Sequence, residues 1–127
     1  MATTTARTTT PTRTSTATRA GAGLIALTGL IHLVTAPEQL DQKAYVGVLF
    51  VLAAVGSGIV AYQLWRADDR RAWGLGTLIA ACCFVGFILS RTTGLPGFKE
   101  EEWEALGVLS LVVEAGFIGV ALTRLRR

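Results

Sequence analysis

Four apolar stretches, separated by short polar connections, occupy the chain from Ala20 onward. Each is about as long as the roughly 20 residues that an α-helix needs to cross the hydrocarbon core of a bilayer. Of the 127 residues, 51% are hydrophobic, and the mean hydropathy is +0.50. Little of the chain is left for a separate soluble domain. We therefore expect an all-α protein, a four-helix transmembrane bundle with spans at about 20–36, 44–65, 72–90 and 105–123.

Glu114 lies near the midpoint of the fourth stretch. A carboxylate at that depth costs roughly 2.5–3.5 kcal/mol on insertion scales, so it has to face other helices and find a partner there. Glu114 is therefore the first candidate for a ligand-binding or proton-binding group. The alternative is a protonated, hydrogen-bonded carboxyl group that only fixes the packing of the helices.

The basic residues are distributed unevenly along the chain. Nine of the 12 lie in the N-terminal segment, the second connection and the C-terminus, whereas Lys43, Arg91 and Lys99 lie in or beside the other two connections. The positive-inside rule then predicts that both termini are cytoplasmic in a bacterial inner (cell) membrane. Because the basic residues do not gather on one face, the net charge of +3 does not indicate nucleic acid. The expected partners are the lipid bilayer and either a second copy or a larger membrane complex.

The ends of the helices are predicted from local signals. Residues 1–19 are rich in threonine and arginine and are expected to form a disordered cytoplasmic tail. A signal peptide cleaved after Ala36 is the other interpretation, although the following Pro37 disfavours cleavage. The first helix is predicted to end at Ala36, before an outer connection at 37–43, because the residue preceding a proline avoids the helical region. The acidic segment 99–104 is predicted to begin the fourth helix.

Polar and small residues recur at helical spacing in each span. The stripes are Thr28, His32 and Thr35; Ala54, Ser57, Gly58 and Ala61; Gly76, Ala80, Cys83, Phe87 and Ser90 or Arg91; and Trp103, Gly107, Ser110 and Glu114. If these stripes meet at the bundle axis, they enclose a polar pocket that opens outward. Glu114 would lie at its floor, His32 on its wall and Arg91 at its mouth. Ser110, Glu38 and Tyr45 complete the candidate binding residues.

Several of these residues also have purely structural interpretations. His32 is equally expected as an interfacial or core histidine, and Arg91 as a side chain that reaches the headgroups. Cys82 and Cys83 are adjacent and point about 100° apart on a helix, so they are expected to pack as small hydrophobic residues. The glutamate run at 100–102 is expected to be a solvated helix start.

Metal, cofactor and catalytic sites are not indicated. A single histidine excludes a bis-histidine haem within one protomer. His32 and Glu114 alone supply only part of a metal site, so no metal or cofactor is expected. No hydrolase, metalloprotease or phosphate-binding motif occurs, and nothing fixes the geometry of a Ser110–His32–Glu114 set. We therefore expect that the protein is not an enzyme.

Three strings are similar to a group of small four-span integral membrane proteins from high-GC Gram-positive bacteria. They are Ile31-His32-Leu33 with Pro37-Glu38, the segment from Leu89 to Gly97, and Trp103-Glu104 with Gly107, Ser110 and Glu114. The resemblance covers about 21–122 and implies the architecture without an activity. It also implies a histidine shortly after the Pro-Glu pair, where this chain has Gln39. Small multidrug transporters have a similar size, but their essential glutamate lies in the first span, where this chain has none.

The function expected from the sequence is the binding or transport of a small solute or proton through the outward-facing pocket. The alternative is a non-catalytic accessory subunit of a larger membrane complex. In that case the polar stripes would specify packing against the partner.

Overall fold

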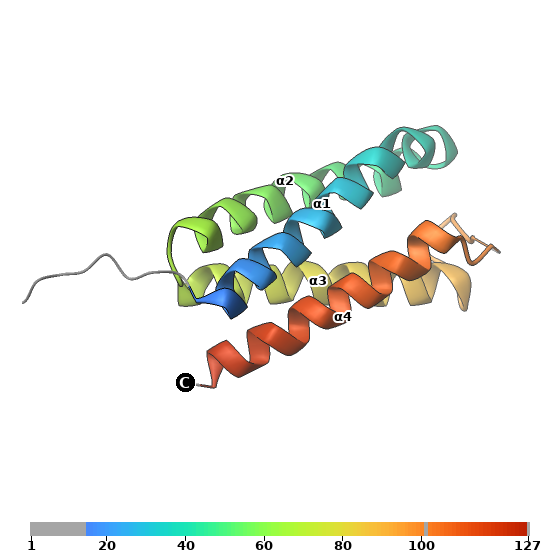
Figure 1. Ribbon diagram of the computed structural model, residues 1–127. Helices are drawn as coiled ribbons and strands as arrows, with labels where there is room; N and C mark the ends of the chain where they lie inside the picture. The colour runs from blue at the N-terminus through green and yellow to red at the C-terminus, as the bar shows by residue number, and fades with distance from the viewer. Residues whose placement is uncertain (1–14, 101, 127) are drawn as a thin grey trace, which may run out of the picture.

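The computed structural model describes residues 15–100 and 102–126, which form four α-helices and no strand (Figure 1). The helices are α1 (Thr16–Gln42), α2 (Ala44–Arg66), α3 (Arg70–Arg91) and α4 (Ala105–Leu125). All four are long and apolar enough to cross a membrane. The prediction of an all-α chain with four candidate spans is therefore confirmed.

The first helix is longer at both ends than the sequence predicts. Ser15 caps α1 by accepting a hydrogen bond from the backbone N–H of Thr18 at 3.2 Å, so residues 16–19 are helical and not part of a disordered tail. The rest of the predicted tail, 1–14, lies outside the described residues. At the other end α1 continues through Pro37 to Gln42, so the predicted end at Ala36 is wrong.

The continuation through Pro37 reduces the predicted 37–43 connection to the single residue Lys43. Pro37 has no N–H to donate to the carbonyl of Leu33, and a membrane helix tolerates this loss when neighbouring helices support it. That support is present, because the backbone of Leu40 packs directly against Gly47 at the start of α2. The close contact between the two helices outweighs the local preference that ends helices before proline.

The fourth helix begins at Ala105, with Glu104 as its N-cap, so the predicted helical start within 99–104 is wrong. Gly94 and Gly97 have positive φ angles of 86° and 64° and turn the chain back on itself after α3. The N–H of Glu100 then donates to the carbonyl of Ser90 at 2.8 Å. This bond holds the described acidic residues against the end of α3 and outside α4.

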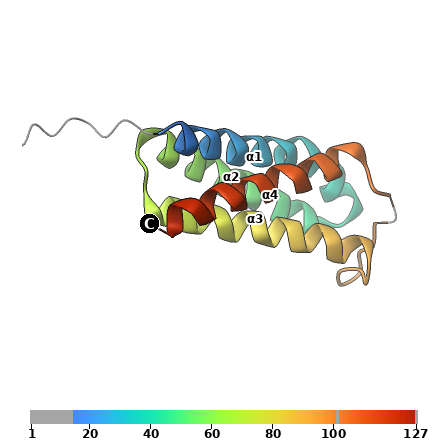
Figure 2. The same ribbon diagram turned by 60° about the horizontal axis from the view of Figure 1, so that its bottom comes forward.

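The helices form two antiparallel pairs, α1 with α2 and α3 with α4. The pairs lie close together at the end where α1 begins and α4 ends, and they diverge toward the other end (Figure 1). Figure 2 shows that α4 is also inclined to α3. We call the first the basic end, because it carries Arg66, Arg70 and Arg124, and the second the acidic end, because it carries Glu38, Glu100 and Glu104. Because the number of helices is even, the start of α1 and the end of α4 share one end of the bundle.

The apolar core fills the basic end. Trp73 of α3 stacks on Phe117 of α4 with ring centroids 5.4 Å apart. Ile25 of α1 and Val60 and Leu64 of α2 pack into the same cluster with no exposed surface. The indole N–H of Trp73 donates to Asp68 at 2.6 Å, so its polar atom is also satisfied. This core joins the two helix pairs where they are closest.

The outer surface of the bundle is strongly apolar. Large aliphatic side chains from all four helices are at least half exposed: Leu30, Leu33, Val34, Val48, Leu49, Leu52, Val55, Ile59, Leu78, Val85 and Val112. Soluble monomers rarely expose so much contiguous apolar surface, whereas lipid-facing helices do. The architecture is that of a multi-pass membrane protein.

The one-residue connection at Lys43 makes Gly47 a sensitive position. A Cβ atom there would lie 2.5 Å from the backbone nitrogen and 2.6 Å from the Cα atom of Leu40, and backbone atoms cannot move aside cheaply. We expect Gly47→Ala to lower the free energy of unfolding by about 1–3 kcal/mol, the usual cost of overpacking. Detergent-solubilised protein unfolded by heat or SDS and followed by circular dichroism measures the effect.

Gly58→Ala is the matched control on the same helix, because a Cβ atom at Gly58 meets nothing within 4 Å. Its stability should be unchanged or slightly higher, since alanine favours helix more than glycine. Equal stability of the two variants would contradict the close α1–α2 contact.

Candidate functional site

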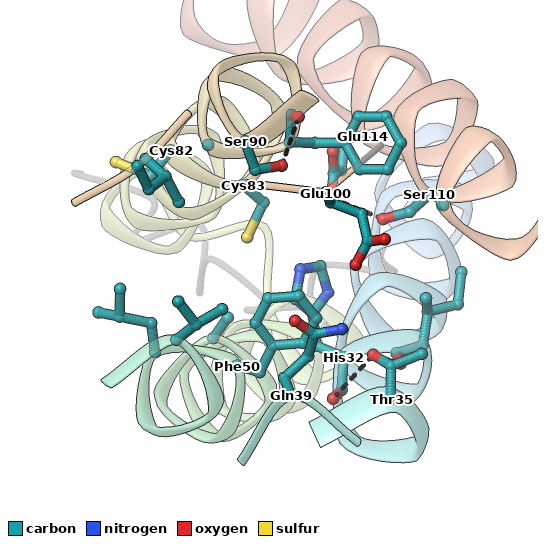
Figure 3. A pocket seen from close by; sticks show the side chains of 18 of the residues that line it. His32, Thr35, Gln39, Phe50, Cys82, Cys83, Ser90, Glu100, Ser110 and Glu114 are labelled. Carbon is teal, nitrogen blue, oxygen red and sulfur yellow. Dashed lines mark hydrogen bonds between the residues drawn. The ribbon is translucent and has the colours of Figure 1, made fainter. Parts of the chain in front are cut away.

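A cavity of about 410 Å³ lies between the two helix pairs at the acidic end, where they diverge (Figure 3). All four helices and the α3–α4 connection contribute to its wall. The apolar core at the basic end lies beyond its inner side. The sequence predicts a polar pocket in this half of the bundle. Of the six candidate residues, Glu114, His32, Ser110 and Arg91 line the cavity.

Glu114 projects into the cavity from the middle of α4 and is only 1% exposed. One turn earlier on the same helix, Ser110 donates a hydrogen bond to its Oε1 atom at 2.8 Å. The Oε2 atom is buried and has no hydrogen-bond partner among the described residues. A buried carboxylate without a partner costs several kcal/mol. The group must therefore be neutralised, either by a proton or by a bound cation.

His32 reaches the same cavity from α1 and is also buried. Its Nδ1 atom lies 2.8 Å from the carbonyl oxygen of Thr28. A carbonyl only accepts hydrogen bonds, so Nδ1 is the protonated nitrogen, and Nε2 keeps a free lone pair when the ring is neutral. Phe50 of α2 packs against the imidazole with ring centroids 4.9 Å apart and restricts its orientation.

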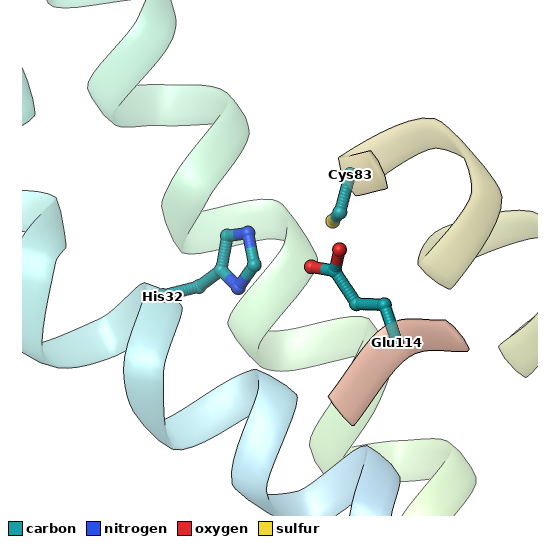
Figure 4. A group of neighbouring side chains, drawn as sticks. All are labelled: His32, Cys83 and Glu114. Atoms are coloured by element: carbon teal, nitrogen blue, oxygen red, sulfur yellow. The ribbon is translucent and has the colours of Figure 1, made fainter. Parts of the chain in front are cut away.

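Cys83 is the residue at this site that the sequence does not single out. One ligand atom from each of His32, Cys83 and Glu114 lies within 4.8 Å of the others, and the three residues come from α1, α3 and α4 (Figure 4). Cys82 also lines the cavity, but it is exposed, and its side chain points away from Cys83, His32 and Glu114 (Figure 3). The expectation that both cysteines pack as small hydrophobic residues stays a prediction, and the position of Cys83 adds a second candidate role for its thiol. Helical spacing already places Cys83 on the inward-facing stripe of the third span, but it does not show that His32 and Glu114 lie opposite its thiol, because those residues belong to two other helices.

Arg91 lies at the mouth of the cavity, at the end of α3. Its guanidinium is 3.6 Å from the ring centroid of Phe87 and donates to the hydroxyl of Ser90 at 2.9 Å. It also donates to the backbone carbonyl of Glu102 at 3.0 Å, so the side chain is fixed in place. Glu100 and Glu104 line the cavity beside it. The charged residues that line the cavity near its mouth are thus Arg91, Glu100 and Glu104.

Glu38 and Tyr45 do not line the cavity. Glu38 is exposed and accepts a hydrogen bond from Gln42 at 3.3 Å. The hydroxyl of Tyr45 donates to the carbonyl of Pro96 at 2.5 Å, which connects α2 to the α3–α4 connection across the acidic end. Tyr45 therefore positions a loop beside the mouth.

The small-residue stripe predicted on α2 does not face the cavity. Ser57 is fully buried, and its Cβ atom and the backbone of Ala54 lie where a side chain on Gly29 of α1 would stand, so these two residues of the stripe pack α2 against α1. The α2 residues that line the cavity are Leu49 and Leu52 at its open side and Val46, Phe50 and Ala53, which are spaced i, i+4 and i+7. Their apolar periodicity is present in the sequence, but it carries no polar group to mark it.

Trp103 is half exposed, precedes α4 and contacts Phe87 edge-on at 5.5 Å between ring centroids, so it is not part of the α4 stripe.

The cavity also has an open side between α2 and α3. Leu49, Leu52 and Leu78 line it and are at least half exposed.

No protein-family model, curated protein or solved structure matches this chain. The resemblance to four-span proteins of high-GC Gram-positive bacteria therefore stays an expectation from the sequence. The case for a function rests on the cavity and on the side chains that converge in it.

Proposed function

We propose that the protein is a multi-pass protein of the bacterial cell membrane that binds a small solute or proton in a pocket facing the outside. The positive-inside rule supports this orientation, because it places the basic end, with both chain termini, in the cytoplasm. The acidic end then faces outward, and the cavity that opens there is accessible from the external medium. We do not assign a catalytic activity.

The observation that carries the proposal is the burial of Glu114. Its side chain is 1% exposed, one oxygen accepts from Ser110, and the other has no partner among the described residues. An ionisable group inside a membrane bundle is costly and by default marks a site that binds or moves a charge. The adjacent cavity gives a cation or proton a path to it.

The packing favours binding over an open channel. Beyond Glu114, the stack of Trp73 on Phe117 with Val60 and Leu64 fills the space between the helices at the basic end. A solute that reaches Glu114 can go no further unless these side chains move. Transport would therefore require a rearrangement of the helix pairs, and we expect a homodimer to provide the larger surroundings that it needs.

An accessory subunit of a larger complex is the second candidate. The observation that favours it is the open side of the cavity between α2 and α3, where Leu49, Leu52 and Leu78 are exposed. Purification in mild detergent distinguishes the two candidate functions. A self-dimer supports the binding protein, whereas one dominant larger partner supports the subunit.

The orientation is tested with C-terminal fusions. We expect a green fluorescent protein fused after Arg127 to fluoresce in a bacterial host and an alkaline phosphatase fused at the same place to be inactive. Both results follow if the basic end is cytoplasmic. Active phosphatase together with a dark fluorescent protein would place the cavity on the cytoplasmic side.

Glu114→Gln tests the binding site, because it removes the charge and keeps the shape of the side chain. We expect at least one class of small cation, from a panel of protons, alkali-metal ions, amines and divalent ions, to raise the thermal stability of the wild-type protein in detergent. A ligand at 100 times its Kd adds about 2.7 kcal/mol. Glu114→Gln should remove the shift and leave membrane insertion intact.

Glu38→Gln is the matched control, because Glu38 is an exposed carboxylate at the same end and outside the cavity. It should retain the full thermal shift. If no member of the panel distinguishes wild type from Glu114→Gln, and the variant only lowers abundance, the carboxyl group has a packing role and the proposal is wrong.

A further inference from the structure

Three side chains with different ligand chemistry converge at the inner part of the cavity. The imidazole of His32, the thiol of Cys83 and the carboxyl group of Glu114 come from α1, α3 and α4, and one ligand atom of each lies within 4.8 Å of the other two (Figure 4). Each is buried or partly buried. Their convergence from separate helices distinguishes this cluster from acidic residues that are merely neighbours on a surface.

We propose that His32, Cys83 and Glu114 bind a zinc ion, with the cavity providing access to a fourth coordination position. This inference rests on the proposed binding function and names the class of solute that the pocket takes. Zinc binds imidazole nitrogen, thiolate sulfur and carboxylate oxygen, and zinc sites with three protein ligands leave a fourth position open.

The hydrogen bond of His32 prepares it as a ligand. Histidines that bind metals usually donate the other ring N–H to a carbonyl or carboxylate, which fixes both the tautomer and the ring orientation. Here Nδ1 donates to the carbonyl of Thr28 at 2.8 Å, and Nε2 is left with its lone pair. Phe50 packs against the ring and holds it toward the cluster.

Glu114 has the same kind of support. Ser110 holds Oε1 at 2.8 Å, and Oε2 is buried without a hydrogen-bond partner among the described residues. A carboxylate oxygen in that state needs a proton or a cation. A bound metal ion would satisfy Oε2. Ser110 would not contact the ion, but its hydrogen bond to Oε1 would keep the carboxyl group oriented toward it.

The charges balance when zinc binds. The cysteine thiol loses its proton to water as the Zn–S bond forms, and the carboxyl group loses its proton, if it holds one, as the Zn–O bond forms. One thiolate and one carboxylate then neutralise the two positive charges of the ion. A neutral cluster is the form that a low-dielectric membrane interior favours.

The ligand types discriminate among metals. Ca²⁺ takes six to eight oxygen ligands and Mg²⁺ near-octahedral oxygen coordination, which a site with a thiolate and an imidazole does not provide. Soft Cu⁺ prefers thiolate and thioether ligands to a carboxylate. In a zinc site with bonds of about 2.0–2.3 Å the ligand atoms lie roughly 3.5 Å apart. Since no two of the three ligand atoms are more than 4.8 Å apart, the side chains need only small rotations to close on the ion.

The cavity makes the site exchangeable. Structural zinc sites are closed by four protein ligands, whereas sites with three protein ligands keep a fourth position for water or another small ligand. Here the cavity connects that position, and the ion itself, to the acidic end. The lining residues near the mouth include Glu100 and Glu104 against a single Arg91, a balance that favours cations. The site therefore suits zinc taken from the external medium.

The test uses the purified full-length protein in detergent with a non-thiol reductant. We expect one Zn²⁺ per chain by metal analysis, and we expect Co²⁺ to bind in the same place with a sulfur-to-cobalt charge-transfer band that Zn²⁺ removes. Cys83→Ser should abolish that band. His32→Gln, Glu114→Gln and Cys83→Ser should each weaken Zn²⁺ binding at least about tenfold, since each removes a direct ligand.

Cys82→Ser is the matched control, because Cys82 is adjacent in sequence but points away from His32 and Glu114 and is not a member of the cluster. It should leave both the band and the affinity unchanged. In that background Cys83 is the remaining thiol, and Zn²⁺ should slow its alkylation by a maleimide. This measurement does not depend on the folding of any ligand variant.

Three outcomes would overturn the zinc site: no sulfur-to-cobalt band, equal Zn²⁺ affinity in Cys83→Ser and Cys82→Ser, or binding that is unaffected by Glu114→Gln. If Zn²⁺ does not bind at this cluster while another small cation still stabilises wild type but not Glu114→Gln, the proposed pocket function stands and only the assignment of zinc is wrong. If Glu114→Gln affects no ligand at all, both proposals fall.

Discussion

The burial of one carboxyl group within an apolar helix bundle is the constraint on which the site depends. Glu114 cannot face lipid without a large free-energy cost, so α4 must present it to the other helices. Ser110, one turn away, supplies the hydrogen bond that makes this burial tolerable. The bundle then has to leave space around the side chain, and the two helix pairs do so by diverging at the acidic end.

The two ends of the bundle therefore have different packing. At the basic end Trp73, Phe117 and Leu64 fill the volume between the pairs, and this close packing holds them together. At the acidic end the pairs are connected mainly through the rim of the cavity, with the α3–α4 connection closing part of it. A tight core at one end allows a hollow at the other without loss of a defined fold.

The sequence predicts the four helices well because hydrophobic length is a strong signal that needs no tertiary information. It fails at Pro37 and at the acidic run before Ala105, where contacts between helices and a glycine-containing turn override local preferences. The sequence also predicts the polar residues of the site. Glu114 and Ser110 lie on one face of the fourth helix, and His32 lies in the first helix at a similar depth in the membrane. The same stripe analysis places Cys83 on the inward face of the third span, but a linear pattern does not distinguish a thiol that meets His32 and Glu114 from a small residue that only packs.

Tyr45 gives the acidic end a property that the helices alone would not have. Its hydroxyl reaches from α2 to the carbonyl of Pro96 in the turn that follows α3, so it crosses from one helix pair to the other. Widening of the aperture by separation of the pairs would have to break this bond or pull the turn along with α2. The size of the aperture is therefore coupled to the conformation of the turn that contains Gly94 and Gly97.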